Sequence, residues 1–201
     1  MGQGIQHLKG MDIYVLDQLM RGRIAAGARV LDVGCGSGRN LRYFLGAGHP
    51  VCAADVDEER VRKARAMCAE SKRDLPADNL RVEPAEDLSF DPGSFDFVIC
   101  NAVLHFARDR EHFERMLRGC WEMLAPAGVL FVRSASLLGL PVDRRGEVGC
   151  HIQPDGDTRF LIDDAFLREC EESLSAQRID PLKTTVVHGK RAMSTWVLAR
   201  E

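Results

Sequence analysis

Apolar positions occur along most of the chain either in short continuous runs or at helical spacing, and the two patterns alternate. Runs at residues 29–33 and 50–55 are typical of buried strands. The segment between them starts at a glycine-rich loop, has helical spacing, and ends at Gly46 and Gly48, which act as helix stops. The pattern therefore predicts a strand, a tight loop, a helix and a second strand, which together form a βαβ unit.

The alternation continues beyond this unit. We expect a helix over residues 57–71, with acidic residues in its first turn, and a short strand over 80–83. A strand within 93–100, a helix over 113–124 and a strand over 129–133 follow. Five strands alternating with helices predict a Rossmann-like, doubly wound α/β sheet that is mostly parallel and has helices on both faces.

The last third of the chain is less regular. Residues 134–159 are rich in glycine, proline and charge, and we expect them to form a lid-like loop. A helix over 162–172 and two β-rich runs, 176–187 and 193–200, follow and bring the sheet to seven strands, the last one antiparallel. We expect a helix over residues 11–20 to pack beside the first strand.

The composition indicates a single domain. A chain of 201 residues, of which 45% are hydrophobic, can bury a core but is short for two full domains. The net charge of -3, without a long basic block, gives no reason to expect a nucleic acid partner. We find neither an apolar stretch near the ~18 residues of a membrane span nor a signal peptide, and expect a cytoplasmic protein without a membrane partner. The seven cysteines form no CxxC pair, so we predict no metal site and mostly reduced core thiols.

The glycine loop after the first strand indicates what the domain binds. Gly34, Gly36 and Gly38 have GxGxG spacing, whereas a dinucleotide fingerprint needs its third glycine one position later, at Arg39. Asp55, at the end of the second strand, can accept hydrogen bonds from both hydroxyls of a ribose. Asp32 suits an ammonium group better than a phosphate. The residues favour a phosphate-free nucleoside with an ammonium group, and a nicotinamide-dependent oxidoreductase is the less favoured alternative.

Four ordered segments carry a resemblance to a known family. "VLDVGCGSGRN", "VCAADVD", "AEDLSFDPGSFDFVICNAVLHF" and "MLAPAGVLFV" resemble the successive motifs of class I S-adenosylmethionine-dependent methyltransferases, over about half of the chain. The resemblance implies S-adenosylmethionine as cofactor and S-adenosylhomocysteine as product. It divides the single domain into a helical segment (1–28), a cofactor-binding core (29–133), the lid-like loop (134–159), and a C-terminal helix with closing strands (160–201).

The resemblance also implies a set of cofactor-binding residues. Asp55 would hold the ribose, Val56 would line the adenine, and Ala85 and Glu86 would lie at the adenine edge. Many family members carry an aspartate where this chain has Pro84, so adenine recognition would depend on the residues after it. The full predicted set is Asp32, Gly34, Cys35, Gly36, Gly38, Arg39, Asn40, Asp55, Val56, Ala85, Glu86, Asn101 and Ala102.

The methyl acceptor is the part of the function that the sequence indicates least directly. Methyl transfer from a sulfonium depends mainly on alignment, and a histidine near the methyl group can serve as a general base. His105 is placed for this role, and His188 and Arg191 lie in a late basic turn that resembles the tellurite-resistance branch of the family. The other cations considered are Arg144, Arg145, His151, Arg159 and Lys190.

Together these cations predict an anionic or oxyanion-like small-molecule acceptor if they converge. A cofactor-binding module without turnover is the alternative function. We expect a monomer or a homodimer.

Overall fold

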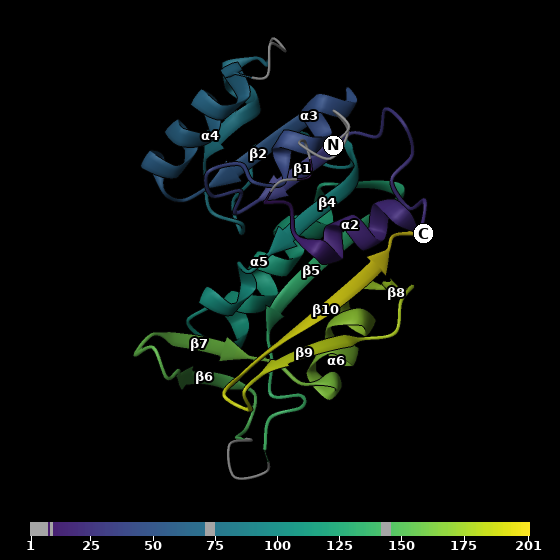
Figure 1. The fold of residues 1–201 in the computed structure, drawn as a ribbon. Helices are drawn as coiled ribbons and strands as arrows, with labels where there is room; N and C mark the ends of the chain where they lie inside the picture. The colour runs from purple at the N-terminus through teal and green to yellow at the C-terminus, as the bar shows by residue number, and fades with distance from the viewer. Residues whose placement is uncertain (1–7, 9, 71–74, 142–145) are drawn as a thin grey trace.

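The computed structural model describes residues 8, 10–70, 75–141 and 146–201, and its centre is a mixed β-sheet (Figure 1). Five neighbouring strands run parallel, in the spatial order β3-β2-β1-β4-β5. Their bounds are Val30–Val33 (β1), Val51–Asp55 (β2), Leu80–Val82 (β3), Phe95–Asn101 (β4) and Leu124–Ala135 (β5). The order reverses between β1 and β4, and the carboxyl ends of these two strands form the usual ligand-binding edge of such a sheet.

The C-terminal strands complete the sheet in the antiparallel direction. β10 (Arg191–Ala199) pairs with β5 on one side and with β8 (Gln177–Arg178) and β9 (Lys183–Val187) on the other. Within the described residues the sheet has eight strands. The predicted mostly parallel sheet with an antiparallel last strand is confirmed, although the run at 176–187 forms two short strands rather than one.

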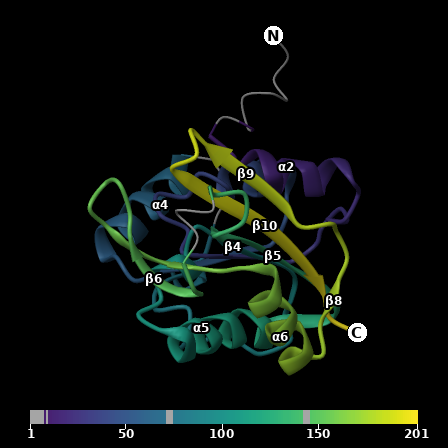
Figure 2. The same cartoon turned by 90° about the horizontal axis from the view of Figure 1, so that it is seen from below.

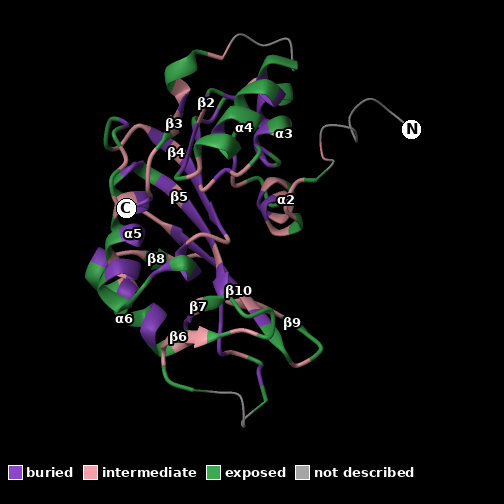
Figure 3. Ribbon diagram, turned by 90° about the vertical axis from the view of Figure 1, so that its left-hand side faces the viewer, coloured by how far each residue is buried: buried purple, intermediate pink, exposed green. Residues whose placement is uncertain are grey.

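Helices cover both faces of the sheet (Figure 2). α2 (Ile13–Met20), α3 (Leu41–Ala47) and α4 (Glu58–Glu70) pack on one face around Phe44 and Phe97. On the other face lie α5 (Arg110–Glu122) and α6 (Asp164–Leu174). The central strands are buried along nearly their whole length, whereas β6 (Gly149–Ile152) and β9 have exposed positions (Figure 3).

The prediction of an irregular loop over residues 134–159 is wrong for 134–135, 149–152 and 158–159, which lie in strands, and the lid-like role stays a prediction. β5 continues to Ala135, and β6 pairs with β7 (Thr158–Leu161) in an antiparallel hairpin whose strands match His151 with Arg159. The hairpin packs against the short 3-10 helix η2 (Leu104–Phe106) at the carboxyl end of β4. A second 3-10 helix, η1, spans Ala77–Asn79.

The structure also bears on two smaller predictions, which concern residues 125–128 and the burial of the cysteines. Residues 125–128, between the predicted helix over 113–124 and the predicted strand over 129–133, lie within β5, where the pairing with β4 shifts register between Phe95 and Phe97. Most cysteines are core thiols as predicted, with the exceptions of the half-buried Cys52 and the exposed Cys150. None of the described helices is both long and apolar enough to cross a lipid bilayer.

Candidate functional site

The loop after β1 is held against the end of β2 by its backbone. The amides of Gly34 and Cys35 both donate to the carbonyl of Ala54, at 2.7 and 3.0 Å. Gly34 has φ +70°, and a Cβ at this position would overlap the side chain of Val103, which follows β4. Glycine is required here both for the backbone conformation and for the close approach of the two segments.

Asp55, the last residue of β2, organises the same loop. Its two carboxylate oxygens accept hydrogen bonds from the amides of Gly36 (2.8 Å) and Asp57 (3.0 Å). A carboxylate has about four acceptor positions, so about two remain for a ligand. Because Asp55 also lines a cavity, the remaining positions fit the two hydroxyls of a ribose.

This cavity, called here the acidic cavity, has a volume of about 440 Å³. It is within the usual size range of small-molecule and cofactor sites. Four carboxylates and one arginine line it, so it favours a cation and disfavours phosphates. The lining residues are Val33, Gly34, Asp55, Val56, Asp57, Arg60, Glu83, Pro84, Ala85, Glu86, Ala102, Val103, Phe106, His112 and Met116.

A histidine that the sequence analysis did not identify fixes Glu86 in this cavity. The Nδ1 of His112 accepts a hydrogen bond from the Arg108 amide, which leaves Nε2 to donate to the Glu86 carboxylate at 2.9 Å. Burial opposes ionisation of Glu86, but its own amide and His112 outweigh this and lower its pKa. Gly119 lets α5 approach closely, because a Cβ there would overlap the carbonyl of Ala85. The sequence signal for His112 was its position in the first turn of the helix after β4.

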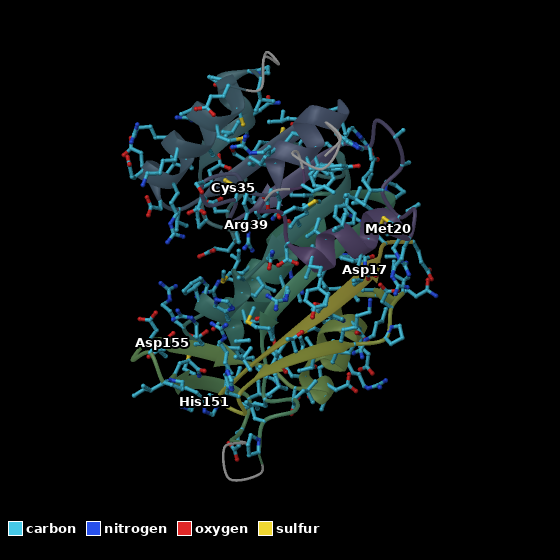
Figure 4. The ribbon with its side chains drawn as sticks, viewed as in Figure 1. Asp17, Met20, Cys35, Arg39, His151 and Asp155 are labelled. Carbon is cyan, nitrogen blue, oxygen red and sulfur yellow. The ribbon has the colours of Figure 1, made fainter. Side chains whose placement is uncertain are left out.

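A second cavity, called here the basic cavity, has a volume of about 260 Å³ and the opposite charge. Four arginines and one aspartate line it. In Figure 4, Arg39 approaches from the upper part of the molecule and Asp155 from the β6–β7 turn below. The lining residues are Arg39, Ala102, His105, Arg133, Ala135, Gln153, Asp155, Arg159, Thr185, Val187, Arg191 and Met193.

Packing and ion pairs hold two of these arginines in place. The guanidinium of Arg133 lies 5.0 Å from the ring centre of Tyr14 and 4.0 Å from a carboxylate oxygen of Asp12. Arg159 lies over the ring of Phe106 at 4.7 Å and pairs with Asp157 at 2.7 Å. Such stacking restricts a guanidinium while leaving several of its donors available.

The pairing of strands gives the basic cavity its remaining wall. Arg133 and Ala135 of β5 lie on the same face of the sheet as Met193 of β10 and Thr185 of β9, because register partners share a face. The hydroxyls of Thr185 and Tyr14 form a hydrogen bond, which ties α2 to this wall. The wall therefore depends on segments far apart in the sequence.

His105 is the titratable group of the basic cavity. It is 6% exposed, and its Nδ1 is buried without a hydrogen-bond partner among the described residues. Burial, together with the charges of Arg159, Arg133 and Arg191, lowers its pKa to about 4. The ring is therefore neutral near pH 7, and Nδ1 can accept a hydrogen bond from a ligand.

The two cavities meet at Ala102, which lines both of them. Ala102 follows the last residue of β4 and has φ 63°, a left-handed conformation that is uncommon for alanine. Its amide donates to the carbonyl of Arg133 at 2.8 Å. The small side chain at this position lets molecules in the two cavities face one another.

The structure brings about half of the predicted cofactor residues to the acidic cavity. Gly36 supports Asp55, and Arg39 lines the basic cavity instead. Asn101 is 6% exposed, with both polar side-chain atoms unpartnered among the described residues. The predicted residues that line the acidic cavity are Gly34, Asp55, Val56, Ala85, Glu86 and Ala102, and those that line neither cavity are Asp32, Cys35, Gly36, Gly38, Asn40 and Asn101.

Asp32 lies on β1, just before the glycine loop. It is 1% exposed, and burial raises the pKa of its carboxyl to about 7. Burial also raises the pKa of the neighbouring Cys35 thiol well above its usual range. Asp32 is therefore almost inaccessible in this structure and lines neither cavity.

The basic residues predicted for acceptor binding do not all lie in one place. His105, Arg159 and Arg191 meet in the basic cavity, whereas His188 lies on the exposed β9–β10 turn and does not line it. Arg144 and Arg145 lie outside the described residues. His151 and Lys190 line a further cavity beside the β6–β7 hairpin.

Part of this chain is similar to known proteins, both in a family model and in a curated relative. Residues 31–132 match the family model described as "Methyltransferase domain". A curated relative named "Ubiquinone biosynthesis O-methyltransferase", from Xanthomonas euvesicatoria pv. vesicatoria, is 40% identical over 108 residues. That match covers 53% of this chain and 43% of the relative, so the chain spans less than half the length of the relative.

Solved structures share the fold over nearly the whole chain. A SAM-dependent methyltransferase from Methanosarcina mazei has a TM-score of 0.72 at 19% identity and covers 90% of this chain and 96% of its own. Magnesium protoporphyrin IX methyltransferase from Synechocystis, with bound SAM, has a TM-score of 0.68 at 18% identity and covers 98% and 81%. Because both identities are below 20%, these similarities are evidence of a shared fold alone.

Proposed function

The chain belongs to the methyltransferase domain family, and we propose that it transfers a methyl group from S-adenosylmethionine to a small anionic acceptor bound in the basic cavity. The predicted family is confirmed, and with it the cofactor. The observation that carries the acceptor proposal is the pair of oppositely charged cavities that meet at Ala102. The predicted relation to the tellurite-resistance branch remains a prediction.

The acidic cavity supplies the residues that would hold the cofactor. S-adenosylmethionine, when bound, supplies a methyl group on a positively charged sulfur, which leaves as neutral S-adenosylhomocysteine. Asp55 would accept hydrogen bonds from the ribose hydroxyls, and Glu86, oriented by His112, lies where the resemblance puts the adenine. The surrounding carboxylates favour a cationic ligand.

The basic cavity supplies the residues that would hold the acceptor. Arg133, Arg159 and Arg191 would bind its anionic group through charge-assisted hydrogen bonds. This attraction fixes the acceptor with its nucleophile facing Ala102, and such alignment can contribute roughly 7 to 11 kcal/mol to the reaction. Neighbouring cations also lower the pKa of an acidic hydroxyl or thiol, which makes it easier to ionise.

His105 would receive the proton of the acceptor. With its own proton on Nε2, the neutral ring accepts a hydrogen bond at Nδ1, which is buried and unpartnered among the described residues. Its low pKa makes it a weak base, so it suits an acceptor whose own pKa has been lowered by the arginines. The general-base role predicted for His105 is therefore proposed for acceptors that carry a proton.

Product formation tests this proposal. The protein is incubated with methyl-labelled S-adenosylmethionine and with carboxylate-bearing phenols, thiols and amines, together with uncharged analogues, tellurite and selenite. We expect label in anionic products. Tight S-adenosylhomocysteine binding without any methylated product would instead support the non-catalytic binding module, and label only in uncharged products would overturn the anionic acceptor.

A further inference from the structure

The basic cavity is larger than a small inorganic oxyanion requires. Its volume of about 260 Å³ is many times the roughly 10 to 15 Å³ that a cavity needs to hold one water molecule. The cavity therefore has room for an acceptor larger than an oxyanion of four or five heavy atoms.

An additional cavity, called here the outer cavity, adjoins the basic cavity. It has a volume of about 370 Å³, and Gln153 lines both. Gln153 is fixed at the start of the β6–β7 turn, where its amide donates to the carbonyl of Asp157 at 2.8 Å. The lining residues of the outer cavity are Leu140, His151, Ile152, Gln153, Pro154, Leu161 and Lys190.

The same two hairpins build the basic and outer cavities. In the β6–β7 hairpin, Arg159 lines the basic cavity and its register partner His151 lines the outer cavity. In the β9–β10 hairpin, Arg191 lines the basic cavity and the adjacent Lys190 lines the outer cavity. Register partners lie on the same side of a hairpin, so one ligand can extend along both cavities.

The two cavities differ in their chemistry. Leu140, Ile152, Pro154 and Leu161 give the outer cavity an apolar side, which faces the polar His151, Gln153 and Lys190, whereas arginines dominate the basic cavity. Ile152 is 80% exposed. A single exposed isoleucine is unremarkable on a protein surface, but one that adjoins three other apolar residues in a cavity offers an apolar ligand a place to bind.

We propose that the acceptor is an elongated amphiphilic anion that spans the basic and outer cavities. Its nucleophile lies beside Ala102, its anionic group lies among the arginines, and its apolar portion continues past Gln153 to Ile152. This inference rests on the proposed function, since it assumes that the acceptor binds in the basic cavity.

Binding of carboxylates of increasing length tests the inference. Calorimetry measures the affinity of butyrate, hexanoate, octanoate and decanoate for the full chain saturated with S-adenosylhomocysteine. We expect affinity to rise by up to about fourfold for each methylene that enters the outer cavity, the factor that corresponds to the transfer free energy of a fully buried methylene. The Ile152→Asp variant should flatten this dependence on length, because it puts a carboxylate beside the apolar portion.

A matched variant separates the outer cavity from a general effect of surface charge. Ile13 on α2 is 70% exposed and lines none of the three cavities, so Ile13→Asp should keep the wild-type dependence on length. Thermal unfolding of both variants checks that they fold.

Three results would overturn the proposals at different levels. No length dependence in the wild type, or an equal dependence in Ile152→Asp, overturns the elongated acceptor alone. Failure of every carboxylate to bind, with S-adenosylhomocysteine binding intact, overturns the anionic acceptor and this inference with it. Failure of S-adenosylhomocysteine itself to bind overturns the proposed function at its first step.

Discussion

The two cavities that meet at Ala102 are built in opposite ways. In the acidic cavity four carboxylates face one arginine, and in the basic cavity four arginines face one aspartate. Opposite charges suit a reaction in which a cationic donor meets an anionic acceptor, because each reactant is attracted to its own side. Under the proposed function, holding the donor and choosing the acceptor would be two tasks of two neighbouring electrostatic environments.

The cavities also differ in which parts of the chain build them. The acidic cavity is lined by residues between Val33 and Met116, mostly at strand ends and in the loops that follow them, with Arg60 from α4 and His112 and Met116 from α5. The basic cavity takes residues from Arg39 to Met193, and much of its wall forms only when β5, β10 and β9 pair. Backbone geometry determines the first cavity, and side chains on a sheet face determine the second.

The largest expected effect concerns the acidic cavity. Asp55→Ala should weaken S-adenosylhomocysteine binding at least a hundredfold, because it removes two hydrogen bonds to a charged group, worth roughly 1.5 to 3 kcal/mol each. It also frees the amides of Gly36 and Asp57 that order the loop. Calorimetry measures the change. Asp96→Ala, which removes a strand carboxylate paired with Arg29 away from both cavities, is the control and should leave the affinity unchanged.

This difference explains what the sequence could and could not predict. Asp55 and the glycine loop were predictable because a short apolar run followed by glycines fixes where a strand ends and what lies there. Arg133 was not singled out, because its place beside Thr185 and Met193 depends on pairing between distant strands. Ala102 was predicted from the resemblance, but its place between two cavities was not.

The β6–β7 hairpin was missed for a local reason. Its turn, "PDGD" at residues 154–157, is a recognisable turn signal. Its strands are only four residues long, and β6 exposes Cys150 and Ile152 instead of burying them, so the alternation expected of a half-buried strand is hidden. The short length of β8 and β9 had the same effect on the run at 176–187.

The second expected effect is that Asp32 and His105 make the free energy of unfolding depend on pH in opposite directions. The Asp32 pKa is raised from 3.8 to about 7 in the folded protein, so its contribution to stability is present below about pH 4 and is lost as pH rises to 7. The His105 pKa is lowered from 6.5 to about 4, so its contribution is present above about pH 6.5 and is lost as pH falls to 4. Each changes the free energy of unfolding by about 1.4 kcal/mol per pH unit.

These two dependences should nearly cancel between pH 4.5 and 6.5 in the wild type, and single variants should separate them. Relative to the wild type, the stability of Asp32→Asn should rise with pH, and that of His105→Gln should fall with pH by a similar amount. Urea unfolding at pH 4.5, 5.5 and 6.5 measures both, and the other titrating groups are common to all three proteins. Parallel curves would contradict the raised pKa of Asp32 and the lowered pKa of His105 that burial causes.

The third expected effect concerns the basic cavity alone. Arg191→Gln should weaken the binding of benzoate to the S-adenosylhomocysteine-saturated protein by roughly tenfold, the lower end for a hydrogen bond to a charged group, because Arg191 is exposed. Arg191→Lys should retain part of the affinity, since it keeps the charge. Arg168→Gln on α6, away from both cavities, is the matched control. An equal loss of S-adenosylhomocysteine affinity in Arg191→Gln would contradict the proposal that the two cavities bind different ligands.

The smallest expected effect concerns His112, and it tests whether ligand binding in the acidic cavity depends on this helix side chain as well as on the residues at the strand ends. His112→Phe keeps an aromatic ring but removes the hydrogen bonds to Glu86 and to the Arg108 amide, so S-adenosylhomocysteine should bind about fivefold more weakly, or about 1 kcal/mol. 5′-Methylthioadenosine should lose the same factor because it keeps the adenine, whereas benzoate binding in the basic cavity should be unaffected. His112→Gln, which retains a donor for Glu86, should recover part of the loss. A loss of affinity for S-adenosylhomocysteine without a loss for 5′-methylthioadenosine would show that His112 does not act through the adenine.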